Sequence, residues 1–449
     1  MKQVCVLGLG YIGLPTAAML ALHGFQVTGV DVDASVLQAI RQRRFRGQEP
    51  GLAALVGQAL ESGRLQLAGE TQPADAFVIA VPTPCTRPPQ AHRSSAAPAR
   101  ADLSYVIAAA ESLVPRLQPG SLVVLESTVP PRTTVDVLTP ILARSGLAIG
   151  GSRGGVMVAH CPERVLPGNI LHELVHDDRI IGGIDRPSAE RARELYAPFA
   201  EGAVFLTDAT TAEMVKLMEN TYRDVNIALA NEFALVAERI GIDIWEAIEL
   251  ANHHPRVRVL KPGPGVGGHC IAIDPWFIAQ MAPDATPLIQ TARRVNDSMP
   301  GHVVRLVKRA VAGIDKPVVA CLGLAYKADV DDVRESPALE VVRRLQAEGI
   351  DVRAFDPHAG RVPGLEDAHC ESLAEAIRGA DCAVLLTDHR ELSSLQPEQL
   401  AAMRHLLVID TRNALRGAAW QQLGERRIAV GAGQHRLRGE YAVSGDVDL

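Results

Sequence analysis

The chain lacks the cysteine patterns of a zinc site or of a disulfide framework. Its seven cysteines are scattered, their number is odd, and no two form a Cys-x-x-Cys pair. Zinc sites and small disulfide scaffolds both place cysteines at short, repeated spacings. We therefore expect no metal site and no disulfide framework, and the unpaired thiols favour a reducing, cytoplasmic location.

The chain also lacks an excess of positive charge and a long apolar run. Its net charge of −7 gives no electrostatic reason to expect nucleic acid as a partner. No stretch of about 18 or more residues is continuously apolar and uncharged, so no membrane span is expected. Residues 1–22 resemble a secretory signal at first, but regularly spaced glycines and Pro15 interrupt their apolar run and argue against that interpretation.

Short apolar runs alternate with helical patterns in both halves of this 449-residue chain, which is too long for a single core. The expected strands cover residues 4–7, 27–30, 77–81 and 122–125, then 318–323, 351–355, 382–386 and 406–409. Between them, residues 210–252 have apolar side chains at helical spacing and predict a long helix with its partners. The pattern predicts an α/β fold with two doubly wound, Rossmann-like parallel sheets joined by a helical central domain.

A glycine-rich signature near the start carries the first functional prediction. Gly8-Leu-Gly-Tyr-Ile-Gly13 follows an expected strand and opens an expected helix, and Asp31 ends the next strand. Gly8 permits a tight turn, Gly10 lets the backbone approach a pyrophosphate, and Gly13 lets the helix pack against the sheet. Asp31 accepts hydrogen bonds from the adenosine ribose and repels a 2′-phosphate, so NAD is favoured over NADP. The alternative is a glycine turn that binds nothing, which leaves Asp31 unexplained.

The second half lacks this signature, because Gly323-Leu-Ala-Tyr-Lys327 stands at the matching place. We therefore expect the second sheet to bind something other than a whole dinucleotide. The predicted domains are an NAD-binding domain over 1–207, a central helical domain over 208–300, and a second Rossmann-like domain over 301–449.

Cys270 lies at the end of the run Gly263-Pro-Gly-Val-Gly-Gly-His-Cys270, which glycine and proline keep out of regular structure. Such a segment brings backbone N–H groups close to a ligand. A thiolate adds to an aldehyde, the resulting thiohemiacetal loses hydride to become a thioester, and water releases an acid. A thiol beside a nicotinamide cofactor thus predicts oxidation of an alcohol to a carboxylate. The alternative is an inert buried cysteine in a turn.

Other polar residues have two interpretations each. Lys216 and Asn220 are four apart on an expected helix, so they either stabilise an oxyanion together or form a solvated surface pair. Glu163 and Arg164 lie in a turn-rich segment and are either site residues or a loop salt bridge. Asp274 either orients water for thioester hydrolysis or simply starts a turn before proline.

Seven motifs, in this order, make the chain similar to the UDP-glucose/GDP-mannose dehydrogenase family over more than 300 residues. They are Gly8–Pro15, Val81-Pro-Thr-Pro84, Glu126-Ser-Thr128, Cys161-Pro-Glu-Arg164, Ala212-Glu-Met-Val-Lys216, Gly267-Gly-His-Cys270 and Asp331-Asp-Val-Arg-Glu-Ser-Pro337. The resemblance implies a homodimer in which a UDP-sugar lies between the two sheet domains. The dimer mate would complete each pocket.

The resemblance also implies roles for individual residues. Cys270 is the implied nucleophile, Lys216 with Asn220 the charge-stabilising acid/base pair, and Glu163, Thr128 and Asp274 position the alkoxide or water. Implied NAD contacts, beyond the glycines, are Tyr11, Ile12, Asp31, Thr83, Thr128 and Arg334. Implied UDP-sugar contacts are Arg164, Val165, Lys216, Asn220, Arg223, His254, Arg256, Tyr326, Lys327 and the backbone around Gly263 and Gly265.

Within the family, the run His254–Ile278 and the segment Tyr222–Asn226 resemble the subgroup that oxidises UDP-N-acetyl-D-mannosamine. Ala272 is informative because many other members have proline there. The same chemistry on UDP-GlcNAc, UDP-GalNAc or UDP-glucose is the first alternative. A two-electron hydroxyacid dehydrogenase and a non-catalytic NAD-sensing protein are alternatives of other classes. The loop Cys85–Ala101 is longer than is usual in the family, and the glycine-rich segment 147–155 leaves a strand boundary uncertain.

Overall fold

The computed structural model describes residues 1–44, 49–86, 99–151, 154–165 and 168–433. They form two compact units: the first contains Met1–Thr221 and Ile273–Gln290, and the second contains Tyr222–Ala272 and the described part of Thr291–Leu449. The three-domain division over 1–207, 208–300 and 301–449 stays a prediction. Most of the loop Cys85–Ala101 lies outside the described residues.

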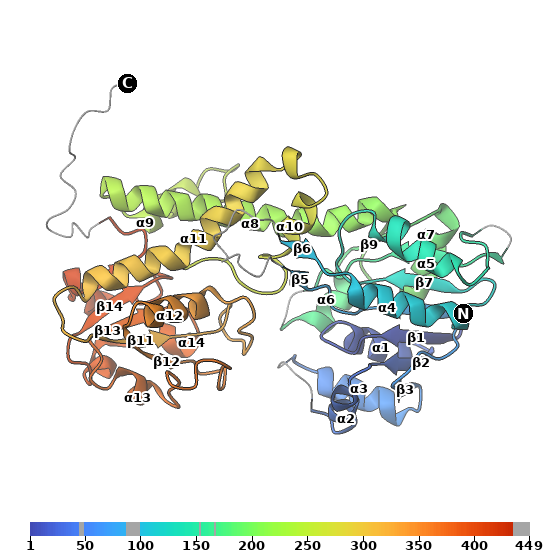
Figure 1. Ribbon diagram of the computed structural model, residues 1–449, viewed down its shortest axis with the longest axis horizontal. Helices are drawn as coiled ribbons and strands as arrows, with labels where there is room; N and C mark the ends of the chain where they lie inside the picture. The colour runs from blue at the N-terminus through green and yellow to red at the C-terminus, as the bar shows by residue number, and fades with distance from the viewer. Residues whose placement is uncertain (45–48, 87–98, 152–153, 166–167, 434–449) are drawn as a thin grey trace. The chain divides into compact units, whose positions relative to one another are not determined.

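The first unit is built on an eight-stranded sheet (Figure 1). Its order is β10-β9-β8-β7-β4-β1-β2-β3, and the pairs are parallel except β8 with β9, which is antiparallel. The strands are β1 (Gln3–Leu7), β2 (Gln26–Val30), β3 (Leu65–Ala68), β4 (Ala76–Ile79), β7 (Leu122–Leu125), β8 (Met157–His160), β9 (Arg179–Gly183) and β10 (Val204–Asp208). Strands β3-β2-β1-β4-β7-β8 have the order of a dinucleotide-binding fold. In it the strands after β1 are added first on one side of β1, up to β3, and then on its other side, from β4 onward.

Alternating side chains bury both faces of this sheet. Val4 and Val6 pack with helices α1 (Gly13–Leu22), α3 (Leu52–Glu61), α6 (Ile170–His176) and α7 (Arg186–Tyr196). Cys5 and Leu7 point to the other face and pack with α4 (Ser104–Leu113) and α5 (Thr139–Ala143). The predicted doubly wound architecture is therefore confirmed, and β1 is buried on both sides as an interior parallel strand should be.

The second unit holds a five-stranded parallel sheet in the order β12-β11-β13-β14-β15. Its strands are β11 (Val318–Leu322), β12 (Asp351–Phe355), β13 (Cys382–Leu385), β14 (Leu407–Asp410) and β15 (Arg427–Ala429). Helix α12 (Pro337–Ala347) and the later turns of α11 (Pro287–Ala310) pack on one face. Helices α13 (Leu373–Ile377), α14 (Arg390–Ser393) and α15 (Ala418–Gln421) pack on the other.

The helical stretch expected over 210–252 is two helices. Helix α8 (Ala209–Ile240) ends at Gly241, whose φ of +82° leaves the helical region. Helix α9 (Ile244–Ala251) then begins with Asp243 as its cap, because the Asp243 carboxylate accepts the amide N–H of Trp245. Glycine and an N-capping aspartate thus separate two segments with the same apolar periodicity.

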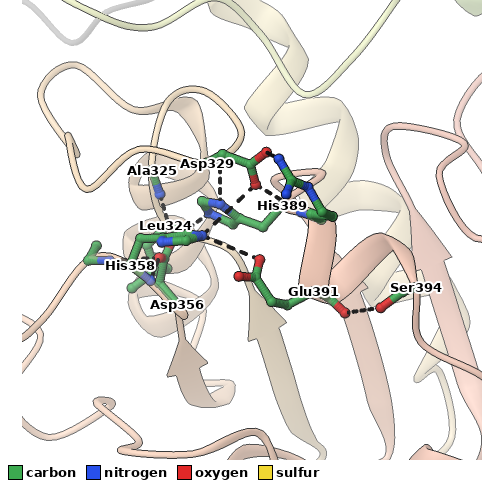
Figure 2. A network of polar contacts seen from close by, with 10 residues as sticks. Leu324, Ala325, Asp329, Asp356, His358, His389, Glu391 and Ser394 are labelled. Carbon is green, nitrogen blue, oxygen red and sulfur yellow. Dashed lines mark hydrogen bonds and ion pairs between the residues drawn. The ribbon is translucent and has the colours of Figure 1, made fainter. Parts of the chain in front are cut away.

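A buried carboxylate organises the carboxyl end of the second sheet (Figure 2). Asp356 follows β12, and its Oδ2 accepts hydrogen bonds from Leu324 N (2.5 Å), Ala325 N (2.9 Å) and His389 Nε2 (3.0 Å). The other ring nitrogen of His389, Nδ1, accepts the amide N–H of Asp329 (2.9 Å). Burial opposes ionisation of Asp356, but these donors outweigh it and hold its pKa well below the ordinary value.

Candidate active site

The turn after β1 has the geometry of a dinucleotide-binding turn. Gly8 has φ +89°, and its amide N–H donates to Val30 O (2.8 Å). A Cβ added to Gly8 would lie 2.6 Å from Ala80 O, and one added to Gly13 would lie 1.9 Å from Gly8 O. Neither position has room for a side chain, so the chain can turn tightly and α1 can approach the sheet.

Gly10 differs, because a Cβ there would meet no atom within 4 Å. The open space lies at the start of α1, whose N-cap residue Ile12 makes no side-chain hydrogen bond to the helix. The first amides of a helix lack intrahelical acceptors and attract anions. A pyrophosphate fits this space without displacing protein atoms.

Asp31 and Thr83 are placed to receive the rest of a dinucleotide. Asp31 Oδ2 accepts Leu9 N (3.0 Å), and Oδ1 accepts Asp33 N (2.9 Å), so the backbone fixes the carboxylate at the end of β2. Thr83 lies after β4, and its Oγ1 is buried without a hydrogen-bond partner in the described protein. A ligand group would satisfy that hydroxyl. The residues present therefore fit NAD.

The other residues expected at the cofactor are placed less decisively. Tyr11 and Ile12 belong to the same turn, and Thr128 follows β7 and is partly buried. Arg334 lies in the second unit, where it forms an ion pair with Asp332 (2.6 Å). Contacts of these four expected residues with NAD stay predictions.

A buried lysine, a buried acid and a partly buried acid form a cluster in the first unit. Lys216 is only 6% exposed on α8, so it is not a solvated surface residue. Asn220, one turn later, donates from Nδ2 to Asp274 Oδ2 (2.6 Å). Asp274 is 2% exposed and is the first residue of helix α10 (Asp274–Ala279) rather than part of a free turn. Glu163, in the loop after β8, also interacts electrostatically with Lys216.

Opposing influences set the charge states of both acids. Burial raises the pKa of Asp274 to about 6, although Lys216 and the Asn220 hydrogen bond favour its ionised form. Burial likewise raises the pKa of Glu163, and Lys216 again opposes the rise. With a pKa of about 6 beside an ammonium group, Asp274 can take up and release a proton near neutral pH.

Arg164 and Val165 lie beside this cluster. Arg164 forms an ion pair with Glu219 (2.6 Å), and its guanidinium also donates to Asp178 O (2.7 Å). Glu163 instead accepts the amide N–H of Val165. The expected alternative of a Glu163–Arg164 loop salt bridge is therefore not what the structure has. Contacts of Arg164 and Val165 with a substrate stay predictions.

Cys270 lies in the second unit and differs from most other cysteines. Five of the seven cysteines are buried, whereas Cys270 and Cys85 are partly exposed. The Cys270 Sγ lies 2.9 Å from His269 Nδ1, and Arg334 interacts with the thiol electrostatically. Burial raises the pKa of Cys321 to about 12, as expected of an inert core thiol. Cys270 therefore does not lie in the buried environment of an inert thiol.

The glycines before Cys270 allow a close approach of backbone to Tyr326. A Cβ on Gly268 would lie 2.8 Å from the Tyr326 ring, and one on Gly267 would lie 2.6 Å from Glu335 O. Gly268 also has φ +83°, and its amide N–H donates to Arg334 O (3.2 Å). The segment after β11 thus packs directly against the thiol loop.

The remaining residues expected at the UDP-sugar are distributed within the second unit. Lys327 follows Tyr326 after β11, Arg223 is exposed on α8, and His254 and Arg256 are exposed after α9. The structure does not bring these side chains into one contact network, so their joint role stays a prediction.

Sequence reasoning missed two residues that hold the expected substrate loop. Asn231, fully buried on α8, accepts the amide N–H of Gly263 at its Oδ1 (2.9 Å). The Arg412 guanidinium lies so close to Gly263 that a Cβ there would be 2.5 Å from its Nη1. Asn231 is embedded in an unremarkable helical pattern, and no local signal marks Arg412.

One group of metal-ligating residues is close together within the described residues (Figure 2). Ligand atoms of Asp329, His358 and His389 lie within 4.8 Å of one another. Both nitrogens of His389 are already hydrogen-bonded, and Asp329 pairs with Arg390 (3.5 Å). The group therefore gives no reason to expect a metal ion. That the protein has no metal site stays a prediction.

Three models of one family match successive parts of the chain. The NAD binding domain of the UDP-glucose/GDP-mannose dehydrogenase family matches residues 2–200, the central domain 210–298, and the UDP binding domain 320–417. The chain belongs to this family. Membership confirms the resemblance, the dehydrogenase activity and the NAD cofactor, and it assigns a UDP-sugar as substrate class.

Individual relatives cover almost the whole chain. It is 48% identical over 438 residues to UDP-N-acetyl-D-mannosamine dehydrogenase from Methanocaldococcus jannaschii, covering 97% of each chain. It is 46% identical over 418 residues to NDP-N-acetyl-D-galactosaminuronic acid dehydrogenase from Ralstonia solanacearum, covering 92% of this chain and 96% of that one. Among solved structures, UDP-D-ManNAc dehydrogenase from Pyrococcus horikoshii has a TM-score of 0.88 at 40% identity and covers 97% and 100% of the two chains.

Within the described ranges, no helix is both long and apolar enough to cross a bilayer.

Gly10→Ala separates cofactor binding from folding. A Cβ at Gly10 meets no protein atom within 4 Å, so the melting temperature should stay unchanged. The same Cβ would enter the space of the pyrophosphate, so the Kd for NAD should rise by about tenfold or more, roughly 1.4 kcal/mol. Calorimetric titration with NAD measures this change. Gly360→Ala, also in open space but in the second unit, is the control and should bind NAD like the wild type.

Proposed function

We propose that this chain oxidises the 6-hydroxymethyl group of UDP-N-acetyl-D-mannosamine to the carboxylate of UDP-N-acetyl-D-mannosaminuronate, using two NAD. The observation that carries the four-electron reaction is the partly exposed Cys270 on a loop that glycines hold against Tyr326. A two-electron hydroxyacid dehydrogenase needs no such thiol. The choice of sugar is supported by the high identity to relatives of that name over nearly the full chain.

The proposed chemistry has three steps. The alcohol O–H proton goes to a base and its C6 hydride to the first NAD, which leaves an aldehyde. The Cys270 sulfur adds to the aldehyde carbon, and the thiohemiacetal loses its second C–H hydride to become a thioester. Water then adds to the thioester carbonyl, the C–S bond breaks, and the thiol and the acid are released. Bound NAD supplies the hydride acceptor in both oxidations.

The cluster around Lys216 suits the proton and charge requirements of these steps. We assign Lys216 and Asn220 to stabilising negative charge on the sugar oxygen, since an ammonium and an amide N–H donor lie on one helix face. We assign Asp274 and Glu163, with Thr128, to positioning the alkoxide or water. Asp274 follows Cys270 by four residues, so the backbone limits the separation of their Cα atoms to roughly 14 Å.

Separate assays with each UDP-sugar test this function. UDP-N-acetyl-D-mannosamine should give a product in which one oxygen atom has replaced two hydrogen atoms at C6, that is a uronate, with two NADH formed per sugar. Mass spectrometry identifies the product, and absorbance measures NADH. Clear turnover of UDP-glucose with none of UDP-N-acetyl-D-mannosamine would overturn the proposed sugar. One NADH per sugar would overturn the four-electron chemistry.

Cys270→Ser should abolish uronate formation, because an alkoxide leaving group is much poorer than a thiolate and serine lacks a base to activate it. Mass analysis should find no acid above background. Cys85→Ser, the other partly exposed cysteine, is the matched control and should keep wild-type turnover. A Cys270→Ser protein with unchanged product formation would favour a role for the chain that needs no thiol.

We also propose that the chain works as a homodimer in the cytoplasm. Five large apolar side chains are exposed on the part of α8 that belongs to the second unit, at spacings that place them on one helix face: Tyr222, Leu229, Phe233, Val236 and Ile240. Such a stripe on a helix face is unfavourable in water and suits a self-complementary interface between two copies. The seven scattered cysteines, with no Cys-x-x-Cys pair, suit a reducing compartment.

Charged substitutions in this stripe test the dimer. Leu229→Glu together with Phe233→Glu should shift the protein from dimer to monomer in sedimentation velocity, because burying two carboxylates costs more than the apolar contact contributes. Tyr105→Glu places the same charge at an exposed apolar residue of α4 and should leave the dimer intact. A wild-type protein that sediments as a monomer at micromolar concentration would contradict the proposal.

A further inference from the structure

Glu126 is a buried acid that the proposed steps do not use. It follows β7 at the carboxyl end of the first sheet and is 4% exposed. Its Oε1 accepts the hydroxyl hydrogen of Tyr196 (2.7 Å), and its Oε2 lies 3.5 Å from Thr16 Oγ1. A carboxyl group this deeply buried is costly unless it has a function or is neutral.

The groups around Glu126 leave it able to change charge. Burial raises its pKa to about 7, the Tyr196 hydrogen bond and Arg179 favour the anion, and Glu163 opposes it. Burial also raises the pKa of Tyr196, and that of the neighbouring Cys161 to about 11, so both stay neutral. Glu126 is thus the group of this set whose proton comes and goes near neutral pH.

A small cavity connects Glu126 with the proposed site. Glu126, Glu163 and Thr16 line it, and its volume is about 20 Å³. A polar cavity of roughly 10–15 Å³ or more holds one water, which needs two to four polar partners. The two carboxyl groups and the threonine hydroxyl provide them. Asp177 and Asp178 also line the cavity and are exposed, so it leads towards solvent.

We propose that Glu126 is a proton-relay residue that takes protons from Glu163 through one water in this cavity. Oxidation of an alcohol to a carboxylate by two NAD and water yields two NADH and three protons. When water attacks the thioester, its O–H proton moves to Glu163 as the new C–O bond forms. Glu163 passes a proton to the cavity water, which gives one to Glu126, and the acids at the cavity mouth return it to solvent.

The relay rests on the proposed role of Glu163. It explains how Glu163 loses the proton that it takes up, which that role by itself leaves open. Glu163 must lose each proton before it can act again, and it is partly buried and interacts with Lys216. A second acid with a pKa near neutral, one water away, removes the proton without moving the lysine.

Glu126→Gln tests the relay, because glutamine keeps an oxygen to accept the Tyr196 hydroxyl but cannot carry a proton. The wild-type kcat should rise with pH through an apparent pKa near 7. In Glu126→Gln this limb should be lost and kcat should fall about tenfold or more at pH 8, within the range of lost acid–base assistance, while KM for the UDP-sugar stays within about twofold. Tyr196→Phe removes a hydrogen bond to the anion, so its limb should move to higher pH.

A matched control is available in the same unit. Glu213 is 1% exposed, burial raises its pKa to about 7, and it accepts hydrogen bonds from Thr134 and Arg132, but it does not line the cavity. Glu213→Gln should keep the wild-type pH profile of kcat even where its melting temperature falls. An equal change of the profile in Glu213→Gln would assign the effect to stability and overturn the relay.

Infrared spectroscopy gives a readout independent of turnover. The wild type should show a protonated carboxyl C=O band that titrates near pH 7 and weakens in Glu126→Gln. A Glu126→Gln enzyme with an unshifted pH profile and unchanged kcat would overturn the relay. Two NADH per sugar from that same variant would leave the proposed function standing, whereas fewer than two from the wild type would overturn the function itself.

Discussion

The site depends on the burial of one positive charge among carboxylates. Lys216 is almost fully enclosed, and an isolated ammonium group in that environment would lose its charge or destabilise the fold. Asp274 and Glu163 compensate it, and Asn220 fixes Asp274 through a hydrogen bond. Helix α8, helix α10 and the loop after β8 must therefore pack so that their polar groups face one another around Lys216. Burial raises the pKa values of both acids although Lys216 opposes the rise, and raised pKa values let carboxyl groups exchange protons during oxidation.

The two sheets show how one local fold serves two ligands. Gly8 and Gly323 both have positive φ, and each donates its amide N–H at 2.8 Å to the end of the neighbouring strand. Asp31 and Asp356 then stand at equivalent places. In the first sheet backbone N–H groups hold Asp31, which remains partly exposed. In the second, His389 donates to Asp356 and both are buried, so that carboxylate is not available to a ribose.

Sequence patterns predicted the strands that apolar runs mark and missed strands that lack such a run. Strands 122–125 and 351–355 match the structure because continuous or alternating apolar runs bordered by polar residues mark them. Strands β3, β9 and β10 were missed, since none of them is an unbroken apolar run and β10 is only partly buried. Asn231 was also missed, because a single polar residue inside a helical pattern has no local signature. Glu126 received no role, although it opens the motif Glu126-Ser-Thr128.

The sequence by itself determined the glycine turn with Asp31, the thiol after a glycine-rich run, and the ordered motifs of the family. These features are local: backbone freedom, residue spacing and chain order define them before any tertiary contact forms. Only the tertiary structure decided which charges are buried. It turned Lys216 and Asn220 from a possible surface pair into an enclosed cluster, and it set Glu126 and Glu163 on one small cavity. Burial and pairing between distant segments set pKa values, and no local pattern encodes them.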